Sequence, residues 1–182
     1  LRNNFRELAK EQHPDADVIL VVDMDLWGGW SVDGLINGCG WLQRKKSAAC
    51  MASTSLFQHN FYAEGPGWGH YDTWALRVHG WKHQMAAWKS LWIPPPGCEP
   101  IKVYSAFGRA ALYRPDAFYA HEYSSFQGDI EHAGLHASMI SDGWEIYLNP
   151  AQRSLMLWLT DEADDERRHD SDQRTDTADA VG

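Results

Sequence analysis

The sequence predicts an α/β domain in which helices pack on a mixed, mainly parallel β-sheet. Residues 18–22, between Asp17 and Asp23, are a continuous aliphatic and β-branched run that follows directly on a short helical pattern. Farther along, a helical pattern beginning at Asp129 is followed at once by a strand pattern over 144–148. Helix and strand patterns that succeed one another in this way are typical of layered α/β folds.

The first predicted elements are a helix and a buried strand. Asn4 can cap a helix whose apolar face carries Phe5, Leu8 and Ala9. The run at 18–22 shows no alternation of polar and apolar residues. That pattern predicts a strand buried on both faces of a parallel sheet.

The central elements are less regular. Ser31 is a good N-cap for a helix over about 32–38, and 48–53 is a short strand candidate. Residues 58–92 are rich in aromatic residues and glycine and lack a clean period. Because long irregular segments in compact domains are usually functional loops, we expect one here.

The last elements are a strand region, a helix and a closing strand. Residues 101–113 fit one strand, or a pair of strands with a bulge near Gly108. Asp129 is a good N-cap for a helix whose end is followed by Gly143, and 144–148 then closes the fold.

Composition and charge exclude several classes of function. The chain has 182 residues, 44% of them hydrophobic, which suits one globular domain. Its longest apolar run is far too short to cross a bilayer, so we expect no membrane span. The 25 acidic and 16 basic residues give a net charge of −9, which argues against nucleic acid as a partner. The three cysteines are an odd number and widely spaced, which favours a reducing, cytoplasmic location.

Much of the negative charge lies at the C-terminal end. Residues 160–182 contain nine acidic residues and three arginines, and almost no large apolar residues. Such a segment cannot bury enough surface to offset its ordering entropy. We therefore expect a folded domain over 1–159 and an acidic, disordered tail over 160–182.

Two carboxylates, Asp23 and Asp25, stand one residue apart at the end of the predicted strand. Ligands of open α/β sheets bind beyond the carboxyl ends of the strands, and paired carboxylates there suit Mg²⁺ or Mn²⁺. The same residues fit equally well a simple turn after the strand. A Mg²⁺-dependent phosphatase with Asp23 as nucleophile is one alternative, but Trp27 stands where haloacid-dehalogenase-like phosphatases normally carry Thr or Val.

Four segments around this pair carry a resemblance to a known family. In order and spacing they resemble a bacterial and chlorovirus group of GT-A glycosyltransferases, and the second is also similar to fungal capsule mannosyltransferase-like proteins. The segments are Asp23 to Gly34, Tyr71 to Arg77, Ser105 to Tyr113, and Glu131-His132 with His136, followed by Ile146 to Pro150. The resemblance covers about residues 2–150. It implies a GT-A-like, three-layer α/β/α domain that is N-terminally truncated, without its first βαβ unit.

The resemblance also implies an activity. It is the metal-dependent transfer of a hexosyl or deoxyhexosyl group from a nucleotide-sugar donor to a glycan or other hydroxyl acceptor. Asp23 and Asp25, with His136, would hold Mn²⁺ or Mg²⁺, and Glu131 or Asp129 would be the general base. The residues expected to bind donor or acceptor are Arg2, Asn3, Asp23, Trp27, Tyr71, Asp72, Arg77, Phe107, Gly108 and His132.

Several of these residues also have a purely structural interpretation. Asp72 and Arg77 fit an internal salt bridge that orders their loop as well as they fit ligand contacts. His132 and His136, four residues apart, lie on one helix face and fit a polar core contact. Gly108 is expected to let the backbone approach the donor sugar. Arg109 stands where the family usually has a second glycine, which changes the shape of the pocket expected there.

Tryptophan is the other unusual feature, with ten in the chain. Aromatic faces cover the apolar faces of sugar rings, and the indole N–H can donate to their hydroxyl groups. The tryptophans nearest the motifs are Trp27, Trp30, Trp68 and Trp74. A catalytically inactive sugar-binding module is therefore the alternative function that is not enzymatic.

Overall fold

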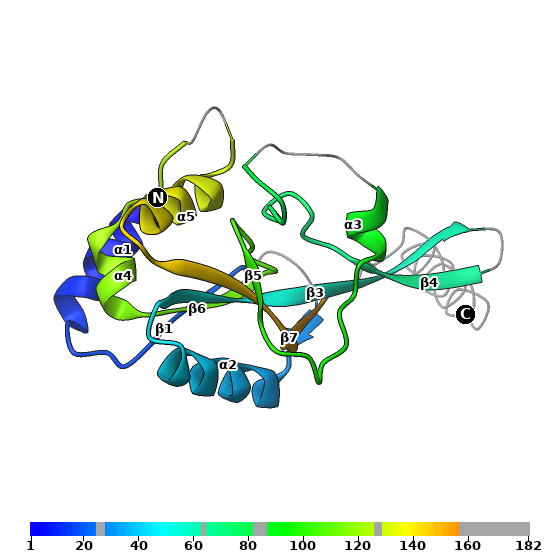
Figure 1. Ribbon diagram of the computed structural model, residues 1–182, viewed down its shortest axis with the longest axis horizontal. Coiled ribbons are helices and arrows are strands. Elements are labelled where there is room, and N and C mark those ends of the chain that lie inside the picture. The colour runs from blue at the N-terminus through cyan, green and yellow to red at the C-terminus, as the bar shows by residue number, and fades with distance from the viewer. Residues whose placement is uncertain (25–27, 63–64, 82–86, 126–128, 157–182) are drawn as a thin grey trace, which may run out of the picture.

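The computed structural model describes residues 1–24, 28–62, 65–81, 87–125 and 129–156. Over these residues the chain is a mixed α/β fold, which confirms the predicted class (Figure 1). Helices of this part of the chain are all too short or too polar to cross a membrane.

Seven strands form one curled, mixed sheet. Five of them follow the order β1-β6-β3-β7-β2, while β4 pairs with β3 and β5 pairs with β7. The strands are β1 (Ile19–Val22), β2 (Gly28–Trp30), β3 (Ala48–Tyr62), β4 (Gly65–His70), β5 (Ile101–Val103), β6 (Ala110–Tyr113) and β7 (Glu145–Met156).

The pairing corrects the expectation of a mainly parallel sheet. Within the described strands, β3 and β7 form the single parallel ladder, and the other five ladders are antiparallel. β1, β3 and β7 do run in one direction, but β6 lies between β1 and β3 and runs against both. Helix and strand patterns alone do not reveal a strand inserted in this way.

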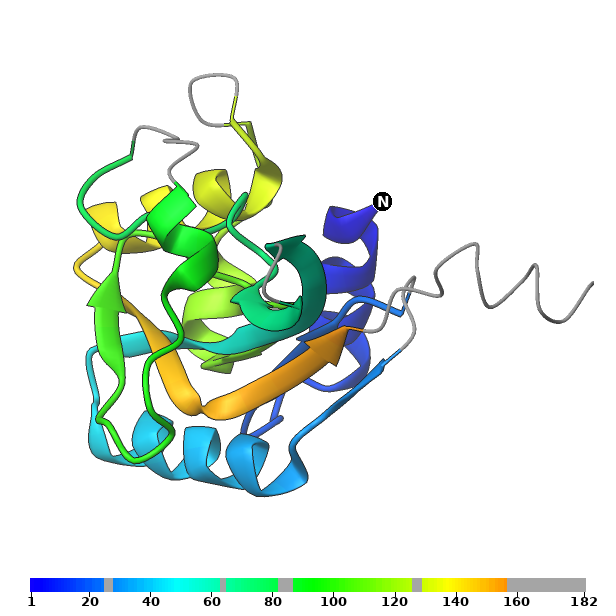
Figure 2. The same ribbon diagram turned by 90° about the vertical axis from the view of Figure 1, so that its right-hand side faces the viewer.

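Helices lie on both sides of the sheet (Figures 1 and 2). Helix α2 (Val32–Arg44) lies along one face, and α1 (Arg2–Gln12), α4 (Pro115–Ala120) and α5 (Glu131–Ser141) gather on the other side. The short α3 (Ala87–Leu91) lies beside β4.

Successive residues of β3 enter two different cores, because side chains alternate across a strand. Cys50 and Ala52 belong to the larger core with Leu135 of α5. Met51 belongs to the smaller core with Leu42 of α2. β3 is therefore the central, doubly covered strand of the domain.

Helix α1 does not pack as its apolar pattern predicts. It begins at Arg2, before the predicted cap Asn4, and Phe5 and Leu8 are 63% and 45% exposed. The buried residue is Arg6, whose guanidinium donates to the backbone carbonyls of Tyr119 and His121 at the end of α4. A buried charge that satisfies two carbonyls thus anchors the helix. Phe5 and Leu8 face outward, while Ala9 packs against the larger core.

Strand β1 is likewise not the doubly buried central strand that was expected. Its one neighbour among the described strands is β6, and Leu20 is 44% exposed. A continuous apolar run does not distinguish a central strand from an edge strand that borders a groove. The carboxyl end of β1 therefore lies at an open side of the sheet.

Local signals at the helix ends were more reliable. Ser31 caps α2, with its hydroxyl accepting from the N–H of Gly34 at 3.0 Å, as predicted. Gly143 follows α5 with φ 89°, also as predicted. Asp129 is not the N-cap of α5, because Ile130 takes that position.

Two predicted segments are more regular than expected. The strand predicted at 48–53 continues to Tyr62, so 58–92 contains the end of β3, all of β4 and α3. Residues 101–113 form two strands that pair with different neighbours. Gly108 lies between these strands with φ 65°.

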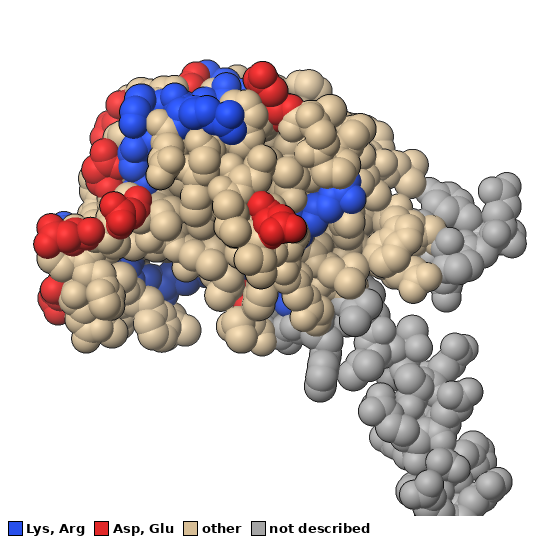
Figure 3. Space-filling model, turned by 90° about the horizontal axis from the view of Figure 1, so that it is seen from below, with Lys and Arg blue, Asp and Glu red and all other residues tan. Residues whose placement is uncertain are grey.

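Figure 3 shows the surface on the α2 side. Both signs of charge are present there, and much of this face is uncharged. At the end of α2, Arg44 and Lys45 lie over the ring of Trp41, at 4.1 and 5.4 Å from its centre.

Candidate functional site

The structure brings three of the predicted site residues together at the end of β1. The guanidinium of Arg2 donates to Asp23 Oδ1 at 3.0 Å, and its Nε lies 3.0 Å from Glu131 Oε1. The backbone N–H of Asp23 is fixed by the carbonyl of Arg109 at 2.9 Å. The first turn of α1 therefore joins a carboxylate at the end of β1 to one at the start of α5.

Arg2 is a fixed positive charge in this cluster. Burial acts to lower the pKa of its guanidinium, but the neighbouring Asp23 carboxylate, helped by Glu131, outweighs burial and raises the pKa. The guanidinium carbon also lies 5.6 Å from the ring centre of Phe107 and 5.8 Å from that of Tyr123. Both rings are close enough to attract a cation. The cluster thus combines a guanidinium fork, which suits anions, with two carboxylates, which suit cations and hydroxyl groups.

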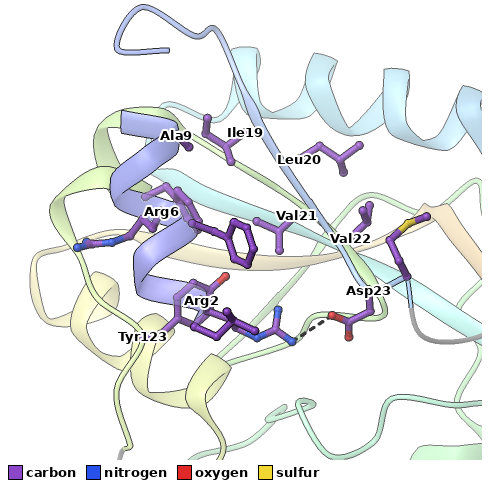
Figure 4. Close-up of a pocket in the computed structure, with 13 residues that line it drawn as sticks. Arg2, Arg6, Ala9, Ile19, Leu20, Val21, Val22, Asp23 and Tyr123 are labelled. Atoms are coloured by element: carbon purple, nitrogen blue, oxygen red, sulfur yellow. Dashed lines mark hydrogen bonds and ion pairs between the residues drawn. The ribbon is translucent and has the colours of Figure 1, made fainter. Parts of the chain in front are cut away.

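A groove of about 740 Å³ opens between α1 and β1 beside this cluster (Figure 4). Its apolar walls include Phe5, Val21 and Tyr123, and Arg2 and Asp23 meet at its polar end. Small-molecule sites have volumes of this order and combine apolar walls with a few polar groups. The groove is therefore large enough for a ligand of nucleotide size.

The outer edge of β1 gives the groove a polar floor. In an antiparallel pair, alternate residues direct their backbone groups to the partner strand. Because Asp23 bonds toward Arg109, Leu20 and Val22 direct their N–H and C=O groups away from β6. Both residues line the groove. Their backbone groups can hydrogen-bond to a ligand there.

Asp72 joins its loop to the segment before β6. Its carboxylate accepts from the N–H of Ala75 at 3.1 Å and from the N–H of Gly108 at 2.8 Å. Burial raises the pKa of this carboxyl against the opposing effect of these two N–H groups, and the nearby Asp23 raises it further. Asp72 therefore positions the backbone around Asp23. The internal salt bridge with Arg77, one of the two alternatives for this residue pair, does not form.

Gly108 is required by packing against β3. It has φ 65°, and a Cβ at this position would lie 1.9 Å from the backbone oxygen of Ser53. This contact explains the glycine without the close approach of a donor sugar that the sequence suggested. The backbone at Gly108 is therefore fixed against Ser53 of β3.

Arg109, where the family's second glycine was expected, keeps the backbone conformation that glycine favours. Its φ is 66°, and among the described non-glycine residues it alone has a positive φ. Its guanidinium donates to the carbonyl of Leu155 at 2.9 Å and lies close to Gly28. Strained backbone of this kind concentrates at functional sites. The arginine thus adds a positive charge beside Gly28 at the start of β2.

Arg77, which was expected to contact a ligand or to pair with Asp72, makes a fork-like contact with Asp129 instead. Its buried guanidinium donates to both carboxylate oxygens of Asp129, at 2.6 and 2.5 Å. Asp129 also accepts from the N–H of Ile130 at 2.8 Å. The Asp129 carboxylate is committed to this pair, so it fixes the start of α5 and is not a free general base.

The two histidines of α5 lie in the core, which corrects the predicted metal role of His136. Its Nδ1 lies 2.9 Å from Ser105 Oγ and its Nε2 lies 3.0 Å from Tyr113 Oη, so both ring nitrogens are engaged. His132 is 4% exposed and stacks on Phe107 with 4.0 Å between ring centres. Burial lowers the pKa of His136 to about 3 and that of His132 well below its usual value. Both are neutral core residues.

The remaining residues that were expected to contact a ligand or metal either make other contacts or lie outside the described residues. Asn3 bonds through its side chain to both the N–H and the carbonyl of Tyr123, which pins α1 in place. Tyr71 packs edge-on against Phe57, 6.1 Å between ring centres. Asp25 and Trp27 lie outside the described residues.

Phe5 and Tyr123, two of the aromatic residues that line the groove, were not predicted as site residues. Phe5 was assigned to the core side of α1, and Tyr123 belongs to no motif. Only the exposed position of Phe5 and the place of Tyr123 beside Arg2 identify them. No pattern in the sequence could have found Tyr123.

The structure describes only some of the residues that would hold a divalent cation. Among the described residues, no three His, Cys, Asp or Glu side chains are grouped to hold a metal ion. Asp23 supplies one carboxylate at the open end of β1, where Asp25 follows two residues later. The candidate metal ligands are therefore carboxylate oxygens, without the imidazole of His136.

No protein-family model matches the chain, and no curated protein is significantly similar to it.

Proposed function

We propose that the chain is a metal-dependent glycosyltransferase that moves a sugar from a nucleotide-sugar donor to a hydroxyl acceptor. The observation that supports this most directly is the meeting of Asp23, Arg2 and Glu131 at the polar end of the groove. A nucleotide sugar offers a flat base, ribose hydroxyls and a charged diphosphate. The groove and the cluster offer a complement to each of these groups.

In this proposal the nucleoside occupies the groove. The base packs against Phe5 and Tyr123, and its polar edge bonds to the backbone of β1. The diphosphate lies at the end of the groove, where the guanidinium fork of Arg2 binds its oxygens. Asp23 accepts from a ribose hydroxyl or contributes to the cation site.

Asp23 and Asp25 are the residues that would hold Mn²⁺ or Mg²⁺, since both ions prefer oxygen ligands. When bound, such an ion stabilises the charge that develops on the leaving diphosphate. Asp23 is shared with Arg2, so binding of the ion competes with the 3.0 Å ion pair. The proposal therefore includes movement of Arg2 from Asp23 toward the phosphates.

Glu131 is the general base in this proposal. Its side chain is 44% exposed and is held by the Nε of Arg2. As the acceptor oxygen attacks the anomeric carbon, the carboxylate takes the hydroxyl proton, and the bond from that carbon to the diphosphate oxygen breaks. Asp129, two residues earlier, fixes the start of the helix that carries Glu131.

Glu131→Gln tests this role. We expect it to lower transfer from the donor by about 100-fold or more while leaving donor binding unchanged, because general-base catalysis typically contributes that much. The exposed Glu11→Gln on the same side of the sheet is the matched control and should leave turnover unchanged. Near wild-type turnover in Glu131→Gln would show that another group takes the proton.

The two alternatives give different results in the same assays. Hydrolysis of a simple phosphate ester without any nucleotide sugar would indicate the phosphatase, with Asp23 as nucleophile. Donor binding in Mn²⁺ without hydrolysis or transfer would indicate the inactive sugar-binding module. Asp23 is paired with Arg2, so its carboxylate is not the free nucleophile that the phosphatase would need. The charged groups that meet there also do not support a sugar-binding module without catalytic activity.

A cytoplasmic location is part of the proposal. Cys39, Cys50 and Cys98 are free thiols. Unpaired cysteines are typical of reducing compartments.

A further inference from the structure

We propose that the acceptor is a neutral oligosaccharide and that it binds across an exposed aromatic surface next to Glu131. This inference rests on the proposed transferase function and narrows its acceptor. The surface, called here the aromatic platform, consists of Trp74, Trp81, Trp88 and Tyr104.

Three of the four platform rings are unusually accessible for such large apolar groups. Trp74 is 58% exposed, Trp88 41% and Tyr104 39%. Trp81 and Tyr104 pack edge to face with 5.3 Å between ring centres, and Trp88 packs on His79 at 6.2 Å. Exposed aromatic side chains that gather in one place mark interaction sites more often than isolated ones do.

One buried arginine connects the platform to the candidate site. The guanidinium of Arg77 donates to the carbonyls of Trp74 and Trp81, at 2.5 and 2.9 Å, and its backbone carbonyl accepts from the N–H of Tyr104 at 2.7 Å. The same guanidinium holds Asp129, two residues before Glu131. The platform is therefore continuous with the start of α5, where the acceptor hydroxyl must lie.

Helix α3 is attached to this segment in a similar way. Lys89, buried next to Trp88, donates from Nζ to the carbonyl of Leu76 at 3.0 Å. In Figure 2, α3 lies beside β4 on the side that faces the viewer, and β4 carries Trp68, which is 51% exposed. Trp68 is thus a further exposed aromatic residue on the strand that contacts α3.

The charge of the platform favours a neutral sugar over other partners. Arg77 and Asp129 neutralise each other, Lys89 is buried, and Lys102 near Tyr104 is paired with Glu145, so each of these charges is paired or buried. Nucleic acid would require cationic groups along its path. Pyranose rings present apolar C–H faces for stacking and hydroxyls for the indole N–H and the tyrosine hydroxyl. A chain of such rings can contact more than one of these aromatic side chains.

The test uses the full chain labelled with 5-fluorotryptophan and observed by ¹⁹F NMR. The tryptophan signals are assigned with single Trp→Phe variants. Neutral tetrasaccharides built from glucose, mannose, xylose or galactose are then titrated without donor. We expect at least one of them to shift the Trp74 and Trp88 signals saturably, while the signal of Trp41, on the α2 side, stays in place.

Variants then test the individual rings. Trp88→Ala and Tyr104→Ala should each weaken binding of that tetrasaccharide about three- to tenfold, as expected for one aromatic contact. Trp88→Tyr keeps an aromatic face and should retain most of the affinity. Trp41→Ala is the matched control and should leave the affinity unchanged.

The outcomes separate this inference from the transferase proposal. If a nucleotide sugar stabilises the protein but no tetrasaccharide shifts the platform signals, the acceptor surface is wrong and the transferase proposal stands. Equal shifts at Trp41 would also overturn it, since binding would then be unspecific. Saturable platform shifts in a protein that binds no donor would support the surface and contradict the transferase.

Discussion

The ion pair between Arg77 and Asp129 gives the sharpest single prediction about the site. Asp129→Asn keeps the size of the side chain and removes the charge that compensates Arg77. The Arg77 side chain has no exposed surface, so it cannot recover solvation by turning outward. Removing one partner of a buried pair costs about 3–5 kcal/mol. We expect the substitution to destabilise the fold and to displace the start of α5.

The structure places the effect at the lower end of that range. Asp129 is 18% exposed, so water screens part of the interaction. The guanidinium of Arg77 also keeps three backbone carbonyls as acceptors, those of Trp74, Leu76 and Trp81. We therefore expect a loss of about 3 kcal/mol in the free energy of unfolding.

Urea unfolding followed by tryptophan fluorescence measures this loss. Asp142→Asn is the control, because Asp142 pairs with His121 while 67% exposed, and it should cost well under about 1 kcal/mol. The double variant Arg77→Met with Asp129→Leu should recover much of the loss, since an apolar pair replaces a buried ionic one. A stable Asp129→Asn variant without turnover would refute the reasoning and make Asp129 the general base.

Three further substitutions or conditions test the fold around the site. Gly108→Ala should cost about 3 kcal/mol or more in urea unfolding, because its Cβ would overlap the carbonyl of Ser53 and its φ is positive; a loss below about 1 kcal/mol would contradict that contact. His136 has its folded pKa lowered to about 3, below the unfolded value of 6.5. Its contribution to stability is therefore complete above pH 6.5 and falls by up to about 1.4 kcal/mol per pH unit below it, so unfolding free energies that are equal at pH 7 and pH 5 would be inconsistent with a buried neutral ring. Asn3→Ala should cost about 1–3 kcal/mol and expose α1 to limited proteolysis, because two buried backbone groups of Tyr123 lose their partner; unchanged proteolysis would show that α1 is held by other contacts.

Features set by neighbouring residues could be predicted from the sequence, whereas features set by distant contacts could not. The cap at Ser31 and the glycine after α5 are set by neighbouring backbone groups, so the sequence predicted both. The exposed edge of β1 was missed because an apolar run has the same pattern at the centre and at the edge of a sheet. The burial of Arg6 was missed because its partners lie more than 110 positions away.

The candidate site shows the same difference between local and long-range features. Asp23 and Glu131 were expected near each other only through the family resemblance, and Arg2 is the residue that joins them. His136 was expected at the metal through the same resemblance. Its engagement by Ser105 and Tyr113 depends on how β6 packs against α5, which no local pattern encodes.

We propose that the cluster at the end of β1 binds a nucleotide sugar with a divalent cation. A thermal-shift panel of nucleotide sugars, each with and without Mn²⁺, tests it on the wild type, Asp23→Ala and Asp25→Ala. At about 100 times Kd, a donor stabilises the fold by about 2.7 kcal/mol, or about 5–10 °C for a chain of this size. We predict a shift of that order for at least one donor, dependent on Mn²⁺ and lost in both variants. Stabilisation that persists without Mn²⁺ and survives both substitutions would contradict the account.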